Sequence, residues 1–303
     1  MTGLVLIPPV PVTDAVLTSS NVAETDYAAW NAATAYVVGD RVIRTASGVH
    51  KIFENLIAGV DATNPESAPT RWIAVSPTNR WKMFDTSNTT TTSAASPVSI
   101  VLLPGQAVNA VALVGLVSST VRVRMTDPTA GTVYDVTTPT GGVITAPDWY
   151  AYFFSTVRPV SAFSALDLPA YPACSVLIDI TNATANVQCA TCVVGYQYEI
   201  GLGVQYGAKV GITDYSVKTA NTFGDYVLTQ RAYSKRATFD MMIAKNEVDV
   251  VGELLAAYRA TPCMWIGSDE YTSTQLFGFY KHFSTVISYP YHSLLSLEIE
   301  GMT

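Results

Sequence analysis

The alternation of side chains in "TVRVRMT" (residues 120–126) and "SVLIDIT" (residues 175–181) decides the fold class. In both segments apolar residues occupy every second position, which is typical of a strand with one face in a core and the other in water. Similar short runs surround them and are separated by turn residues: "VSIVLL" (98–103), "AVALVGLV" (110–117), "TVYDVTT" (132–138) and "TCVVGYQYEI" (191–200). This spacing predicts an antiparallel, jelly-roll-like β-sandwich across residues 78–201.

The last hundred residues predict a second β domain, residues 202–303, that carries one amphipathic helix. Within "NEVDVVGELLAAYRATP" (246–262), the apolar residues fall at helical spacing on one face: Val248, Val251, Leu254, Leu255 and Tyr258. Asn246 is the expected cap at the start, and Pro262 prevents continuation at the end. The flanking runs "CMWIGS" and "HSLLSLEIEG" predict strands.

The first 24 residues predict an extended N-terminal arm. Pro8, Pro9 and Pro11 favour the polyproline conformation. Such an arm finds its apolar partners on another domain or another subunit. No basic residue precedes the apolar patch, so a secretory signal is not expected and the chain is expected to be made in the cytoplasm.

Composition limits the classes of function. The chain has 303 residues and a net charge of −7, with 49% hydrophobic and only 14% charged residues. This length allows two or three domains, and the acidic balance argues against nucleic acid as a partner. Every apolar run is interrupted before the roughly 18 residues that a membrane-spanning helix needs. A β-rich chain with so few charges is suited to burying its surface against other proteins.

Residues 25–77 predict a small separate module. In "AAWNAATAYVVGDRV" (28–42) and "PTRWIAV" (69–75), two tryptophans bracket a Tyr and a Gly-Asp turn. This order resembles the small chitin-binding modules of bacterial chitinases and cellulases. The resemblance implies a carbohydrate site in which aromatic faces stack on sugar rings. The residues that it assigns to sugar contact are Tyr36, Phe53 and Trp72, and those that it assigns to the module core are Trp30, Gly39, Asp40 and Val42.

The module also departs from that pattern. In "GVHKIFENL" (48–56), Glu54 and Asn55 stand where the chitin-binding modules carry exposed aromatic residues. Trp30 and Trp72 are expected to contribute to the small core, which leaves Tyr36 as the clearest stacking ring. A second interpretation therefore stays open, in which the module is kept as a docking or spacer fold.

A second resemblance covers about half of the chain. The segments "NRWKMFD" (79–85), "LLAAYRATPCMWIG" (254–267) and "LFGFYKHFSTVISYP" (276–290) are similar to minor tail and baseplate proteins of long-tailed bacteriophages. The resemblance implies a structural protein of the virion tail tip or baseplate. It implies homo-oligomerisation, other phage tail proteins as partners, and contact with host surface polysaccharide.

No residue pattern predicts catalysis, a metal or a cofactor. Cys189 and Cys192 form a lone C-x-x-C without a second ligand pair, so ordinary buried thiols are expected. The histidines are His50, His282 and His292, and the last two are expected to pack at partly buried or interfacial positions. Two rival functions remain: a carbohydrate-binding adhesion protein, and a glycan hydrolase whose only candidate acids are Asp269 and Glu270.

Overall fold

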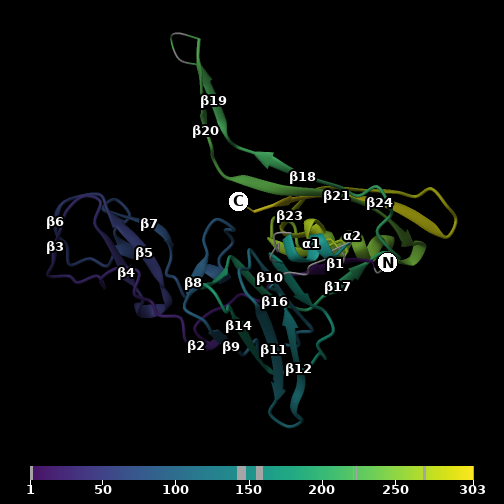
Figure 1. The fold of residues 1–303 in the computed structure, drawn as a ribbon, viewed down its shortest axis with the longest axis horizontal. Helices are drawn as coiled ribbons and strands as arrows, with labels where there is room; N and C mark the ends of the chain where they lie inside the picture. The colour runs from purple at the N-terminus through teal and green to yellow at the C-terminus, as the bar shows by residue number, and fades with distance from the viewer. Residues whose placement is uncertain are drawn as a thin grey trace.

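The computed structural model describes residues 3–141, 148–154, 160–220, 222, 224–268 and 271–302 (Figure 1). The described part is mainly antiparallel β-structure, which confirms the predicted fold class. Its helices are α1 (Trp149–Phe154) and α2 (Val248–Ala257), and its 3-10 turns are η1 (Ala46–Gly48), η2 (Pro65–Ser67), η3 (Lys82–Phe84), η4 (Lys245–Glu247) and η5 (Thr272–Thr274). None of the described helices is long and apolar enough to cross a membrane.

Two sheets form the predicted sandwich. The five-stranded sheet has the order β12 (Gly131–Pro139), β11 (Thr120–Asp127), β14 (Ser175–Thr181), β9 (Val98–Leu102) and β2 (Leu17–Ser20). The three-stranded sheet has the order β13 (Ala162–Ala165), β10 (Ala110–Val114) and β16 (Thr191–Gly195). Alternate residues of β9, β11 and β14 are buried against Val111, Leu113 and Val194. The apolar residues at every second position of these strands therefore face the core, as the sequence predicted.

A third sheet covers the other face of the three-stranded sheet. Its order is β17 (Tyr198–Ile200), β1 (Leu4–Ile7), β22 (Cys263–Ile266), β23 (Gln275–Val286), β24 (His292–Gly301), β21 (Tyr233–Ala244) and β18 (Lys209–Asp214). Val5, Ile7 and Met264 of this sheet meet Ala110 and Ala112 of β10. Because β10 is covered on both faces, all five of its residues are buried, and its sequence is a continuous apolar run.

Helix α2 packs on the face of the seven-stranded sheet that points away from the three-stranded sheet. Val251 and Leu255 are buried against this face, and Val248, Leu254 and Tyr258 pack at the margin, so the predicted helical face is confirmed. The predicted cap is wrong. Asn246 lies in the 3-10 turn η4, which adds a tighter turn before the helix, and the N-cap residue Glu247 makes no side-chain cap bond.

The first 24 residues are part of the sheets instead of a free arm. β1 is a fully buried strand between β17 and β22, and β2 pairs with β9 at the edge of the sandwich. Between them the amide of Val10 donates to the carbonyl of Val194 at 2.8 Å. The apolar partners of this segment are domains of the same chain, and the segment ties the sandwich to the seven-stranded sheet.

The module lies to one side of this layered body, in purple and blue in Figure 1. It contains a three-stranded sheet of β4 (Arg41–Arg44), β5 (Lys51–Asn55) and β7 (Trp72–Pro77) and a two-stranded pair of β3 (Ala35–Tyr36) and β6 (Gly59–Val60). A further short pair, β8 (Thr92–Ala94) with β15 (Val187–Cys189), lies where the chain returns to the sandwich.

A long hairpin, β19 (Val217–Ala220) with β20 (Tyr226–Thr229), projects away from the body beyond β18 and β21 (Figure 1). All but one of its strand side chains are exposed. The sequence predicted strands in this region, but it held no sign that they leave the body.

Candidate functional site: the module and its junction

The aromatic residues assigned to sugar contact form the core of the module. Tyr36, Phe53 and Trp72 are only 7%, 4% and 2% exposed and belong to one cluster with Val42. The rings of Tyr36 and Trp72 meet edge to face with centroids 5.1 Å apart. The hydroxyl of Tyr36 accepts a hydrogen bond from the amide of Asn31 at 2.8 Å. These contacts cover the ring faces that a sugar would need.

The assignment of Tyr36, Phe53 and Trp72 to sugar stacking is therefore corrected, because stacking requires an exposed ring face. The physical reason is the size of the module, whose short strands need these large side chains to fill any core at all. Two core assignments agree with the structure. Val42 is buried opposite Phe53, and Trp30 packs half-buried at the edge of the cluster, with the guanidinium of Arg44 5.4 Å from its ring centroid.

Gly39 and Asp40 form a turn instead of part of the core. Gly39 has a φ of +91°, which favours glycine, and its amide donates to the carbonyl of Asn55 at 2.8 Å. The Asp40 carboxylate accepts from the amide of Val37 at 2.8 Å. The fully buried side chain of Asn55 donates to the carbonyl of Val37 at 2.9 Å. Asn55 thus binds the turn to β5 through its side chain and its backbone. At this position the chitin-binding pattern has an aromatic residue.

The surface beside this turn is aliphatic. We call it the module tip, and it consists of the exposed residues Val37, Val38, Leu56, Ile57 and Val60. Aliphatic side chains offer no flat π-face to a sugar ring, and clustered exposed apolar residues mark protein contact. The tip is the part of the module that is suited to docking.

A polar network holds the module against the body, and Glu24 is its centre. Its carboxylate accepts from Thr78 Oγ1 at 2.8 Å and lies 3.0 Å from Arg80 and 2.9 Å from His50 Nδ1. The second ring nitrogen of His50 lies 2.7 Å from a carboxylate oxygen of Asp14. The network joins the first 24 residues, the module and the segment after it.

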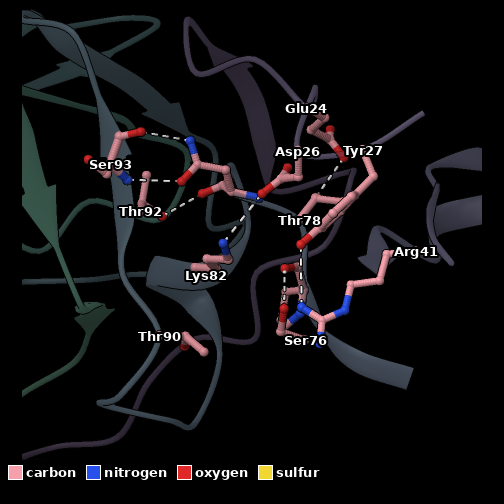
Figure 2. A network of polar contacts seen from close by, with 12 residues as sticks. Glu24, Asp26, Tyr27, Arg41, Ser76, Thr78, Lys82, Thr90, Thr92 and Ser93 are labelled. Carbon is pink, nitrogen blue, oxygen red and sulfur yellow. Dashed lines mark hydrogen bonds and ion pairs between the residues drawn. The ribbon is translucent and has the colours of Figure 1, made fainter. Parts of the chain in front are cut away.

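A second set of bonds continues from the network toward the sandwich (Figure 2). Asp26 pairs with Lys82 at 3.3 Å and accepts from the amide of Asn79 at 3.0 Å. Asn79 in turn exchanges side-chain bonds with the backbone of Ser93, at 2.8 and 2.9 Å. The module is therefore attached to the body by polar bonds at both ends of its sequence, through residues 24–26 and 78–82.

An open groove of about 520 Å³ runs along this junction, lined among others by Asp14, His50, Trp81, Phe84 and Asp85. The rings of His50 and Trp81 stack with centroids 4.5 Å apart. Burial raises the pKa of the Asp85 carboxyl, against the hydrogen bonds that it accepts from Thr90 and Ser87. The sequence does not predict this junction. Its polar residues Asp14, Glu24, His50 and Arg80 follow no motif spacing and meet only in the folded chain.

The other candidate residues do not assemble a reactive centre within the described ranges. The four cysteines are free and buried, as expected, and among the described residues no group of three or more His, Cys, Asp or Glu is placed to hold a metal. His292 is partly buried, and His282 is exposed in the single chain. Asp269 and Glu270 lie outside the described residues.

Comparison with known proteins adds little beyond the fold. No family model and no curated protein matches the chain. Among solved structures, it is similar to chitosan-binding module 1 of a chitosanase/glucanase from Paenibacillus sp. IK-5, with 18% identity and a TM-score of 0.25 over 37% of this chain and 81% of that chain. A selenomethionine-labelled mutant of the same module gives 18% identity and 0.26 over 38% and 82%.

Proposed function

We propose that the chain is a structural subunit of a virion, located in the tail tip or baseplate of a long-tailed bacteriophage, and that it catalyses no reaction. Its partners are other tail proteins and further copies of itself. The tail context rests on the sequence resemblance of residues 79–85, 254–267 and 276–290. The structure supports only the more general part of the proposal, which is that the chain functions by binding other proteins.

The observation that carries this part is the projecting hairpin. A two-stranded hairpin alone in water is marginally stable, because it buries too little apolar surface. β19 and β20 nevertheless leave the body with Tyr226, Val227 and Leu228 exposed. Clustered exposed apolar residues mark contact surfaces, so a hairpin of this kind is suited to insertion against a neighbouring protein. The module tip offers a second surface of the same character.

Deletion of the gene from the phage that encodes this chain tests the proposal. The expected particles have absent or incomplete tails, because a missing structural subunit stops assembly. A smaller deletion that replaces residues 217–229 by a Gly-Ser linker is expected to give the same defect while the purified protein still folds. Complete tails on particles that only fail to adsorb to cells would reject the structural role and favour adhesion.

Carbohydrate binding is the second candidate, and one observation favours it at a different place. In helix α1 of the sandwich, Trp149 and Phe153 are 79% and 70% exposed, and their rings stack with an interplanar angle of 24°. Exposed, nearly parallel rings are the arrangement that stacks on pyranose faces. In this interpretation the chain retains host surface polysaccharide through α1, and the module core plays no direct part.

Retention on immobilised chitosan and on polysaccharide extracted from host cells tests this candidate. Trp149→Ala is expected to lose retention, while Tyr206→Ala, which removes another exposed ring elsewhere, keeps it. Equal retention of the two variants, or no retention of the unaltered protein, would reject the α1 site.

A further inference from the structure

We propose that β18 pairs edge to edge with β18 of a second copy of the chain, so that two seven-stranded sheets join into one continuous antiparallel sheet. The inference goes beyond the proposed function, because it requires neither a phage nor any other tail protein.

β18 is a free edge without the usual protection. It is the last strand of its sheet, and five of its six residues are exposed. Natural edges are blunted by proline, by bulges, by charged side chains or by being very short. The charged residues of β18 lie only at its two ends, at Lys209 and Asp214. β18 contains no proline and pairs with β21 without a register shift, whereas the opposite edge, β17, has only three residues. A regular six-residue edge is a template for another strand.

The backbone groups that point outward can be identified. The amide of Tyr215 donates to the carbonyl of Ala232 at 3.2 Å, so these two residues form a hydrogen-bonded pair. Hydrogen-bonded and non-bonded pairs alternate along an antiparallel ladder. The unbroken register of β18 with β21 therefore directs the N–H and C=O groups of Val210, Ile212 and Asp214 away from β21. These outward groups face solvent and are open to pairing with another strand.

The side chains make this edge complementary to itself. A two-fold axis perpendicular to the sheet pairs residues on the same face, and an axis through Gly211 places Val210 opposite Ile212 of the second copy, twice. Both residues then pair through their outward backbone groups. Val210 and Ile212 are 48% and 60% exposed, and Val210 lies beside the buried Ala237. Lys209 then faces Thr213, so like charges do not meet.

This register also selects between neighbouring alternatives. With the axis through Ile212, Ile212 would face its own copy and each Val210 would face Asp214, so one apolar pair would replace two. With the axis through Gly211, each copy contributes two apolar residues, and the two glycines at the centre leave room for close approach. A second copy is therefore the occupant that fits β18, since the same six residues supply both halves of the match.

Sedimentation equilibrium of the full-length protein tests the proposal, at concentrations up to about 0.1 mM, where a micromolar dissociation constant gives mostly dimer. The unaltered protein is expected to be a dimer. Ile212→Pro removes an outward N–H that β21 does not use, and it is expected to weaken the dimer at least about 100-fold. Val210→Lys is expected to do the same by placing a charge opposite each Ile212.

Val136→Lys, at an exposed position of the distant edge strand β12 beside the buried Val123, is the matched control and is expected to remain dimeric. Thermal unfolding separates dissociation from misfolding, and Val210→Lys decides the outcome if Ile212→Pro does not fold. A monomer at all concentrations, or a dimer that both β18 variants leave intact, would overturn the proposal. Since these measurements use purified protein alone, their failure is distinct from a failure of the tail assignment.

Discussion

Trp72 shows how one residue changes the interpretation of the module. Its position in the sequence fits a sugar-binding pattern, but its ring is closed off by Tyr36 and the β5 strand. The same aromatic spacing serves a core or a binding face, and the sequence contains nothing that separates the two. Exposure separates them, and exposure depends on how few other apolar residues the module has for its core.

Trp72→Ala is expected to destabilise the module by about 3–5 kcal/mol, since a buried Trp leaves a large cavity. Tyr36→Phe keeps the ring and loses the two hydrogen bonds between its hydroxyl and the backbone of Asn31, so the expected cost is about 1–2 kcal/mol. Hydrogen exchange of the β4 and β5 amides measures both costs. Unchanged protection of these amides in Trp72→Ala would show that the ring is not part of the core.

The buried thiols predict a dependence of stability on alkaline pH. Burial raises the pKa of Cys189 and of Cys263 to about 12, whereas an unfolded thiol titrates near about 8.5. Between these values the unfolded chain loses thiol protons that the folded chain keeps. The free energy of unfolding is therefore expected to fall as pH rises from about 8 toward 11.

Denaturant unfolding at a series of pH values measures this effect, with Cys263→Ala as the control. The variant is expected to show a shallower decline, because it lacks one of the thiols. An identical decline in both proteins would assign the effect to other groups. Maleimide is also expected to leave the four thiols unlabelled until the chain unfolds, because all of them are buried.

At the scale of elements, the sequence predicted the strands and α2 because their periodicity is local. It did not predict that β10 lies between two sheets or that β1 belongs to a sheet made mostly of residues beyond 200. Both facts depend on contacts between distant segments. Ala110 and Ala112 are the feature of the sequence that reflects the contact between β10 and the seven-stranded sheet. Their small side chains allow the two sheets to approach closely.

Ala112→Leu is expected to destabilise the protein by about 1–3 kcal/mol, because its side chain is fully buried between β10 and the seven-stranded sheet. Thermal unfolding of the purified protein measures the cost. Val136→Leu, at an exposed strand position, is the control and is expected to change stability little. A full-length protein that tolerates Ala112→Leu without loss would contradict the close contact of these layers.

At the scale of the whole molecule, the junction at Glu24 decides how the module is presented. The carboxylate is mostly buried and holds Arg80, His50 and Thr78 together. The sequence predicted a module and its approximate limits, but not whether it would be a loose bead or a fixed part. The attachment of the module depends on polar residues that are far apart in the sequence and meet only after folding.

Glu24→Gln is expected to destabilise the junction by about 1.5–3 kcal/mol, since it weakens hydrogen bonds to charged groups. Limited proteolysis between the module and the sandwich is then expected to be faster. Glu54→Gln is the matched control, because Glu54 pairs with Arg41 at an exposed position, where such pairs contribute about 0–1 kcal/mol. Equal proteolysis of the two variants would show that Glu24 does not fix the module.

The most direct test of the proposed function is the location of the chain in the intact particle. Gold-labelled antibodies against residues 25–77, viewed by electron microscopy on purified virions, report that location. The proposal predicts label at the end of the tail, in a constant number of copies per particle. Purified particles that lack label, and that lack peptides of the chain by mass spectrometry, would contradict it.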